Sequence, residues 1–348
     1  MIAVGLMSGT SLDGIDAALV DIRPSGNGYA VELLDFAIVP FSRELANELP
    51  SALPPRDGSV PLVAKLQQQL GHAYADAAVR IAGAQPVSYV AMHGQTVYHD
   101  GEQSITLQLG SPYFIRDRMH TTVCYDFRSA DCALGGHGAP LVPYVDALLL
   151  ASAQEDRVAL NLGGIANITC LRRGTSMEQV IAFDSGPGNM LIDAFVQQRS
   201  GGALQFDGGG KIAARGAVDN GALMKMLRDP YFDQAPPKST GRERFGAQFL
   251  TTHEDVLGGL SPQDGAATLT ALTAHTVADA IRANAPSGAR IFVSGGGARN
   301  LTLISALQER LCEYRVEPSA EMSLPGDAKE ALAFAILGYE TLRGRPAN

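Results

Sequence analysis

The alternation of apolar and polar residues divides the chain into strands and helices. Two apolar runs, 4–7 and 15–20, flank a turn of small polar residues, which predicts strand, loop and strand with no room for a helix. Alternation over 29–39 adds a third strand, so the chain opens as a β-meander. Apolar residues then recur at three- and four-residue steps over 60–81, which predicts a helix, and the apolar run 87–92 predicts a buried strand after it.

The second half of the chain repeats the layout of the opening hairpin. Apolar runs on either side of a Gly-Gly pair, within 158–170, predict a second strand, turn and strand. Two such hairpins in successive halves indicate a duplicated fold. The remaining predicted elements are strands at 106–109, 121–124, 180–183 and 290–293, and helices at 143–150, 190–198, 265–284 and from 329 onward.

A glycine-rich hinge at 135–140 marks an expected domain boundary. We expect residues 1–137 with 328–348 to form an N-terminal domain, and residues 138–327 to form a C-terminal domain. In a duplicated fold the two hairpins would face each other across a cleft between the domains, with the phosphates of a nucleotide clamped between them.

Composition restricts the class of protein. A chain of 348 residues, 46% hydrophobic and 18% charged, is long enough for two domains with sizeable cores. The net charge of -9 argues against general binding to nucleic acid or to a membrane surface. No apolar stretch is long enough to cross a bilayer and no basic leader opens the sequence, so we expect a cytoplasmic protein. The four cysteines form neither a CxxC pair nor a zinc-site spacing, which favours reduced thiols.

The first loop has the composition of an anion site. Gly9 and Gly14 permit close approach of the backbone, and backbone N–H groups with the Thr10 and Ser11 hydroxyls can donate to a phosphate. Asp13 would repel a bare phosphate, so its carboxylate predicts a Mg²⁺ ion held through water. An ordinary hairpin turn is the alternative.

Polar residues at the predicted strand ends are candidates for substrate contact. His93 and Gln95 follow the buried strand 87–92, where open α/β folds place their ligands, although His93 alternatively fits a core histidine bonded to the backbone. Arg128 has the planar fork that recognises a carboxylate in a bidentate way. A structural ion pair with Asp126 or Asp131 is the alternative for Arg128.

Two further carboxylates lie where catalysis is plausible. Asp184 ends an apolar strand beside a glycine-rich turn and a helix start, which suits a general base, with a helix cap as the alternative. Glu330 lies in the first turn of the last helix, where it would face the cleft or favour the helix dipole. The run 294–297, Ser-Gly-Gly-Gly, suits close approach to a flat base and ribose.

Together these motifs resemble the anhydro-N-acetylmuramic acid kinases of the actin, sugar-kinase and heat-shock ATPase superfamily. Two positions depart from the family pattern, because Ser185 stands in place of a threonine and His137 in place of a glutamine. The resemblance runs from Gly5 nearly to the carboxyl terminus, on GTSLDGID at 9–16, HGQT at 93–96, DFRSAD at 126–131, NLGGIAN at 161–167, FDSGPGN at 183–189, KSTGRE at 238–243, SGGGARN at 294–300 and KEALAF at 329–334.

The resemblance implies a two-domain, actin-like (ribonuclease-H-like) α/β ATPase fold. It implies an ATP- and Mg²⁺-dependent enzyme of cell-wall sugar recycling that makes N-acetylmuramic acid 6-phosphate, and a homodimer. Asp184 matches the general base and Glu330 a second carboxylate near the attacking water. Our hypothesis is that His93, Gln95, Arg128 and Asp131 contact the sugar, while the nucleotide and its metal are bound by Gly9, Thr10, Ser11, Leu12, Asp13, Gly14, Ile15, Asp16, Gly163, Gly164, Asn167, Gly295, Gly296, Gly297 and Asn300.

Two alternatives stay open from the sequence. The first is a related sugar or acetate kinase that has no hydrolytic step. The second is a nucleotide-dependent binding protein in which closure around the nucleotide is the output, although the chain has no residues left over for the peptide-binding domain typical of that class.

Overall fold

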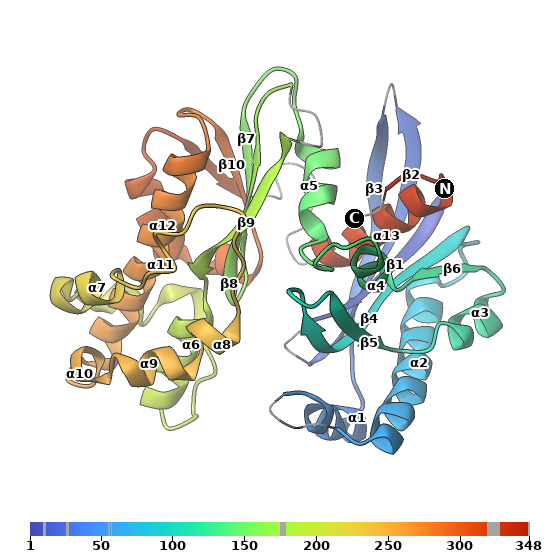
Figure 1. The fold of residues 1–348 in the computed structure, drawn as a ribbon, viewed down its shortest axis with the longest axis horizontal. Helices are drawn as coiled ribbons and strands as arrows, with labels where there is room; N and C mark the ends of the chain where they lie inside the picture. Colours follow the sequence, from blue (N-terminus) through green and yellow to red (C-terminus); the bar gives the residue numbers. More distant parts are fainter. Residues whose placement is uncertain are drawn as a thin grey trace. The chain divides into compact units, whose positions relative to one another are not determined.

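The computed structural model describes residues 1–9, 12–25, 28–54, 56, 58–174, 179–318 and 328–346. Its residues form two compact units, Met1–Val145 with Ala328–Asn348, and Asp146–Asp327. The division falls within helix α5 (Val142–Leu150), whereas the sequence analysis placed the boundary just before that helix. Each unit contains one β-sheet flanked by helices (Figure 1).

The sheet of the first unit follows the order β3-β2-β1-β4-β5, and β6 also pairs with β4. Strands β1, β2 and β3 form the predicted antiparallel meander, while β4 runs parallel to both β1 and β6. The bounds are β1 Ile2–Ser8, β2 Gly14–Ser25, β3 Gly28–Pro40, β4 Tyr89–Asp100, β5 Ile105–Leu109 and β6 Thr122–Tyr125.

The sheet of the second unit repeats this connectivity. Its order is β11-β10-β7-β8-β9, in which β7, β8 and β9 form an antiparallel meander and β10 runs parallel to β7 and β11. The path β3-β2-β1-β4-β6 and the path β9-β8-β7-β10-β11 therefore agree in order and in direction, which confirms the predicted duplication. The bounds are β7 Arg157–Leu162, β8 Ile165–Leu171, β9 Ile181–Pro187, β10 Arg290–Ser294 and β11 Arg315–Pro318.

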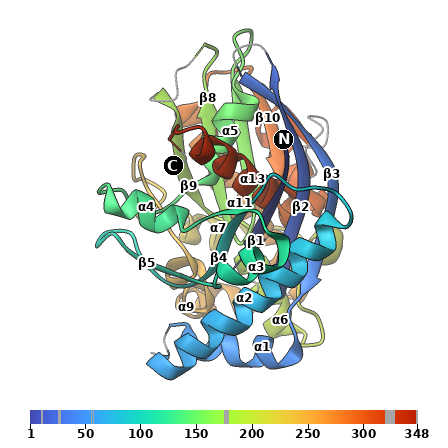
Figure 2. The same ribbon diagram turned by 90° about the vertical axis from the view of Figure 1, so that its right-hand side faces the viewer.

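Helices α2 and α13 cover opposite faces of the first sheet (Figure 1 and Figure 2). Apolar residues of α2, among them Leu70 and Tyr74, share a core with Val4 and Leu6 of β1. Gly5 lies between these two residues on β1 and faces the other side of the sheet, where it packs directly against the backbone of α13. The bounds are α1 Arg43–Glu48, α2 Val60–Ala82, α3 Tyr113–Met119, α4 Phe127–Ala133 and α13 Lys329–Leu342.

Helices α11 and α12 cover one face of the second sheet, where Val277, Ile281 and Leu307 share a core with Leu160 and Ile168. Helix α11 begins three residues earlier than predicted, because Ser261 caps it and a proline occupies its first turn. The bounds are α6 Met190–Arg199, α7 Asn220–Met226, α8 Arg242–Phe245, α9 Ala247–Thr252, α10 Glu254–Leu257, α11 Pro262–Asn284 and α12 Leu301–Arg310.

Helix α4 was missed by the sequence analysis, which expected no helix after the strand at 121–124. The residue before this helix, Asp126, adopts a left-handed conformation (φ 62) and makes no side-chain capping bond. A seven-residue helix without a capped start carries almost no sequence signal. None of the described helices has the length and apolar character needed to cross a membrane.

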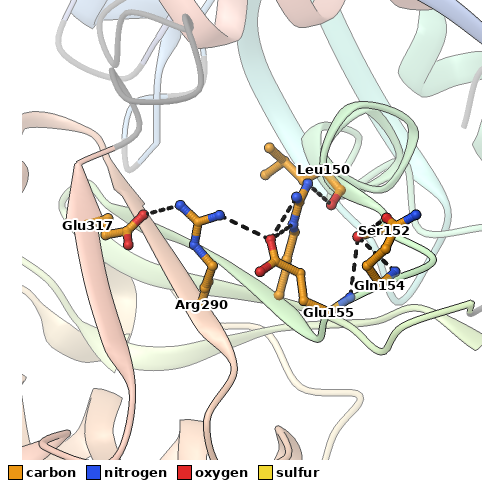
Figure 3. A network of polar contacts seen from close by, with 7 residues as sticks. Leu150, Ser152, Gln154, Glu155, Arg290 and Glu317 are labelled. Atoms are coloured by element: carbon orange, nitrogen blue, oxygen red, sulfur yellow. Dashed lines mark hydrogen bonds and ion pairs between the residues drawn. The ribbon is translucent and has the colours of Figure 1, made fainter.

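Ion pairs fix the amino ends of the strands in the second sheet (Figure 3). Arg290 at the start of β10 binds Glu155 before β7 at 3.1 Å and Glu317 on β11 at 2.5 Å. Ser152 Oγ accepts from the backbone N–H of Gln154 at 3.1 Å and so closes the turn that leads to β7. These contacts hold the edge of the sheet opposite to the carboxyl ends of β7 and β10.

The close packing of α13 on β1 predicts a large effect of Gly5→Ala. An added Cβ would lie 1.9 Å from the carbonyl oxygen of Ala331. Because backbone must move to relieve the overlap, we expect the free energy of unfolding to fall by about 1–3 kcal/mol in denaturant titrations. Gly259→Ala is the control, since nothing lies within 4 Å of its added Cβ. Equal unfolding midpoints for the two variants would contradict this packing.

Candidate active site

The loop between β1 and β2 owes part of its glycine content to packing. A Cβ at Gly14 would lie 2.5 Å from the carbonyl oxygen of Val39, so the pairing of β2 with β3 already requires glycine there. Leu12 adopts a left-handed conformation (φ 58), which is uncommon for a leucine. The predicted hydroxyl donors Thr10 and Ser11 lie outside the described residues.

Three carboxylates, Asp13, Asp16 and Glu330, interact electrostatically at this loop. Burial, together with the charges of Glu330 and Asp13, raises the pKa of Asp16 to about 6. Burial also raises the pKa of Glu330, against the opposing charges of Arg128 and Lys329. No three His, Cys, Asp or Glu side chains in the described ranges form a metal cage. Carboxylates that repel one another, without a full ligand set, fit a hydrated Mg²⁺ that also binds phosphate oxygens.

The half-buried Arg128 and the buried His93 form a hydrogen-bonded pair in the first unit. Arg128 Nε donates to His93 Nε2 at 2.8 Å, and Arg128 Nη1 donates to the carbonyl of Gly138 at 2.7 Å. Burial, with the charge of Arg128, holds the pKa of His93 well below its usual value, so the imidazole is neutral. Because Nε2 accepts, the proton is on Nδ1, which is buried and has no partner among the described residues.

Gln95 and Asp131 each make a hydrogen bond to the backbone. Strand β4 continues to Asp100, so His93 and Gln95 lie inside the strand, whereas the sequence analysis expected them after its end. Gln95 Nε2 donates to the carbonyl of Gly9 at 3.2 Å, which ties the middle of β4 to the β1–β2 loop, while Gln95 Oε1 is buried without a partner among the described residues. Asp131 Oδ2 accepts from the N–H of Gly138 at 2.6 Å. Arg128 and Asp131 therefore hold the same glycine of the hinge.

In the second unit, four polar residues lie in one row across the sheet. The strand register aligns Ser294 of β10 with Asn161 of β7, Asn161 with Asn167 of β8, and Asn167 with Asp184 of β9. Ser294 Oγ donates to Asn161 Oδ1 at 3.4 Å, and Asn167 Nδ2 donates to Asp184 Oδ1 at 3.0 Å. Residues from three separate motifs are thereby brought together near the carboxyl ends of β7 and β10.

Asp184 is held on every side. Its Oδ2 accepts from the N–H of Thr240 at 3.0 Å, and its backbone carbonyl accepts from the Tyr231 hydroxyl at 2.8 Å. Its backbone N–H donates to the carbonyl of Lys238 at 3.1 Å. Burial raises the pKa of the Asp184 carboxyl, while the hydrogen bonds from Asn167 and Thr240 lower it. The helix-cap alternative is wrong, because Asp184 lies inside β9 and the residue before α6 is another one.

The predicted glycine turns interlock by close backbone contacts. The N–H of Gly188 donates to the carbonyl of Gly164 at 2.8 Å, and a Cβ at Gly188 would lie 2.2 Å from Gly163 O. Gly295 adopts a left-handed conformation (φ 82), and a Cβ at Gly297 would lie 2.6 Å from the side chain of Leu162.

Asn300 has a structural role that the sequence analysis did not assign. Its Oδ1 caps α12 by accepting from the N–H of Leu303 at 3.0 Å. A part in nucleotide binding stays a prediction for Asn300, as it does for the glycine turns.

The loop that precedes α8 was missed as part of this site. Lys238 Nζ donates to the carbonyl of Tyr231 at 3.0 Å and lies 4.6 Å from the centre of the Tyr231 ring. The composition of the motif 238–243 indicates a polar loop that core packing does not explain. Nothing in that composition indicates that Lys238 and Thr240 form hydrogen bonds with Asp184.

Comparison with known proteins identifies the family. The family model for anhydro-N-acetylmuramic acid kinase matches residues 1–348. The chain belongs to this family. Anhydro-N-acetylmuramic acid kinase from Streptomyces coelicolor is 43% identical over 99% of this chain and 89% of its own length. The enzymes of that name from Gloeobacter violaceus and Bacillus cereus are 42% and 38% identical, each over 100% of this chain and 94% of their own length.

Membership of the anhydro-N-acetylmuramic acid kinases confirms the enzyme class predicted from the motifs. The chain is a phosphotransferase that uses ATP. The relatives that match over nearly the whole chain are named anhydro-N-acetylmuramic acid kinases, which favours this activity over both alternatives, a related sugar or acetate kinase and a nucleotide-dependent binding protein. The departures at Ser185 and His137 do not remove the chain from the family.

The Arg128–His93 pair predicts a histidine that does not titrate near neutrality. We expect the ring ¹⁵N signals of His93 to stay those of a neutral imidazole between about pH 8 and pH 6. Arg128→Ala should raise the pKa of His93, because a neighbouring positive charge is removed and water gains access to the ring. A wild-type His93 that protonates in this range would contradict the described pairing.

Proposed function

We propose that the enzyme opens the 1,6-anhydro ring of 1,6-anhydro-N-acetylmuramic acid with water and phosphorylates O6, giving N-acetylmuramic acid 6-phosphate and ADP. Water adds to C1 and loses a proton, the C1–O6 bond breaks, and O6 takes the γ-phosphoryl group as its bond to ADP breaks. The observation that carries the proposal is Asp184, a carboxylate with each oxygen bonded to one donor, in a chain of this family.

Asp184 is suited to remove the proton from the attacking water. Each of its oxygens accepts one hydrogen bond from the protein and keeps lone-pair capacity for a water. Burial makes the carboxylate more basic, while the two hydrogen bonds favour its ionised form. These opposing effects act on a base whose orientation is fixed by both hydrogen bonds.

We assign the sugar contacts to His93, Gln95, Arg128 and Asp131. The Nδ1–H of His93 and Oε1 of Gln95 offer a buried donor and a buried acceptor, which suit hydroxyl or amide groups. Arg128 uses two of its donors within the protein, and its charge suits the lactyl carboxylate. Glu330, which the resemblance matches to a second carboxylate, would assist the water through its half-buried carboxyl, whose pKa is raised by desolvation.

The nucleotide is assigned to glycine-rich turns of both units. Gly9, the loop 12–16 and the turn Gly163-Gly164 would bind phosphates, and Gly295–Gly297 the base and ribose. When bound beside Asp13, Mg²⁺ would neutralise charge on the phosphates. An enzyme that uses ATP is expected where ATP is abundant, so we propose a cytoplasmic location. A homodimer is proposed from the family resemblance and is testable by sedimentation.

The proposed reaction predicts where an oxygen from water ends. Purified protein, Mg-ATP and 1,6-anhydro-N-acetylmuramic acid in ¹⁸O-labelled water should give a phosphosugar that carries the label at the anomeric oxygen. Mass spectrometry of the product reads this directly. A phosphosugar without the label would exclude hydrolytic opening, and the absence of any phosphosugar would sink the proposed substrate.

The role of Asp184 predicts a large loss of turnover in Asp184→Asn. The amide keeps the shape of the side chain but cannot take a proton, so kcat should fall by about a hundredfold or more. Asp193→Asn is the matched control, because burial also raises the pKa of Asp193, to about 6, on helix α6 outside the proposed site. Near-normal turnover in Asp184→Asn would remove Asp184 from the role of base.

A further inference from the structure

We propose that Asn167 orients the carboxylate of Asp184 toward the attacking water, in place of the nucleotide contact that the sequence analysis predicted for it. The inference rests on the proposed function of Asp184 as the base. It makes Asn167 a positioning residue, which acts on the reaction through another side chain.

The geometry of the two strands points to this role. Asn167 and Asp184 are register partners on β8 and β9, just past a bulge between Ala166 and Asn167. The Asn167 amide donates to Asp184 Oδ1 at 3.0 Å. The facing strand β7 places Asn161 opposite Asn167, so β8 is paired on both sides at this position.

Asn167 supplies a constraint that the loop before α8 does not. Lys238, Thr240 and Tyr231 bond to the backbone and to Oδ2 of Asp184, and all three come from residues 231–240. Asn167 is on the sheet itself and bonds to the other oxygen, Oδ1. A carboxylate can rotate about its Cβ–Cγ bond unless both oxygens are held, so the Asn167 bond fixes the plane of the base.

The same bond tunes the acidity of the base. The hydrogen bonds from Asn167 and from the Thr240 N–H lower the pKa of Asp184, against the burial and the negative charge of Glu243, which raise it. Loss of the Asn167 amide should therefore raise the pKa of Asp184. Below this pKa the base is protonated and inactive, so the acid limb of the pH–kcat profile should move to higher pH by about one unit.

The experiment compares Asn167→Ala and Asn167→Asp with wild type over the full pH range. We expect both variants to shift the acid limb upward, Asn167→Asp by more because it adds a like charge beside Asp184. Thr169→Val is the matched control. Thr169 lies two residues along β8, is buried, and its Oγ1 has no hydrogen-bond partner among the described residues, so its removal should leave the acid limb in place.

The outcomes separate the two roles of Asn167. A shifted acid limb with an unchanged KM for ATP supports positioning of the base. A raised KM for ATP with an unmoved acid limb overturns the proposal and favours the nucleotide contact. An unmoved acid limb with an unchanged KM also overturns the proposal, and it supports neither role. If Asn167→Ala does not fold, the near-isosteric Asn167→Asp decides.

A direct titration keeps this test independent of the proposed reaction. The ¹³C carboxyl signal of Asp184 reports its pKa without turnover, and it should move upward in both Asn167 variants. Failure of wild type to make any phosphosugar would count against the proposed function alone. An Asp184 pKa that does not respond to either variant would count against the role of Asn167 alone.

Discussion

Inside a sheet, a carboxylate stays ionised only where hydrogen-bond donors replace the water it has lost. Burying such a charge without partners costs several kcal/mol or shifts its pKa until it becomes neutral. In the second unit this requirement organises the region around Asp184. Asn167 donates from the sheet, Thr240 donates from the loop, and Tyr231 and Lys238 fix the backbone of the same residue. The loop and the sheet are thus held together by the need to satisfy one charge.

The first unit meets a related requirement with opposite charges. The half-buried Arg128 and the half-buried Glu330 interact electrostatically, and the charge of each favours the ionised form of the other. His93 accepts from Arg128 and remains neutral, because burial and then the positive charge of Arg128 both lower the pKa of its imidazole. The unit therefore offers the guanidinium of Arg128, several carboxylates and a neutral imidazole donor within a single region, which suits an anionic sugar and a metal-bound phosphate.

Duplication explains why both regions lie at the same place in their sheets. In each unit a meander hairpin is followed by a parallel strand, and the polar residues cluster where the parallel strands end. Parallel strands present their carboxyl ends at one edge, which is where α/β proteins bind ligands. The two sheets carry different residues there. The first has acids and an arginine, and the second has amides and a fixed base.

The sequence alone determined most of the elements, the duplicated plan and the family. Apolar periodicity is a local property, and it places both ends of the long helix α2 within one residue and the start of α13 at the predicted residue. Only short elements escaped, as α4 did, because its start has no cap. The identity of Asp184 as a candidate base also followed from local signals, namely a strand end beside a glycine turn.

What surrounds Asp184 was decided by tertiary structure. Thr240 and Tyr231 are 56 and 47 residues away along the chain, and no periodicity relates them to β9. Strand register determined that Asn167 bonds to Asp184, since a shift of one residue would turn its side chain to the opposite face. Hydrophobic pattern sets which segments fold into strands and helices. The partners of a charged side chain depend on how those segments pack. A hydrogen bond requires donor and acceptor within about 3 Å, and only folding brings residues so distant in the sequence that close together.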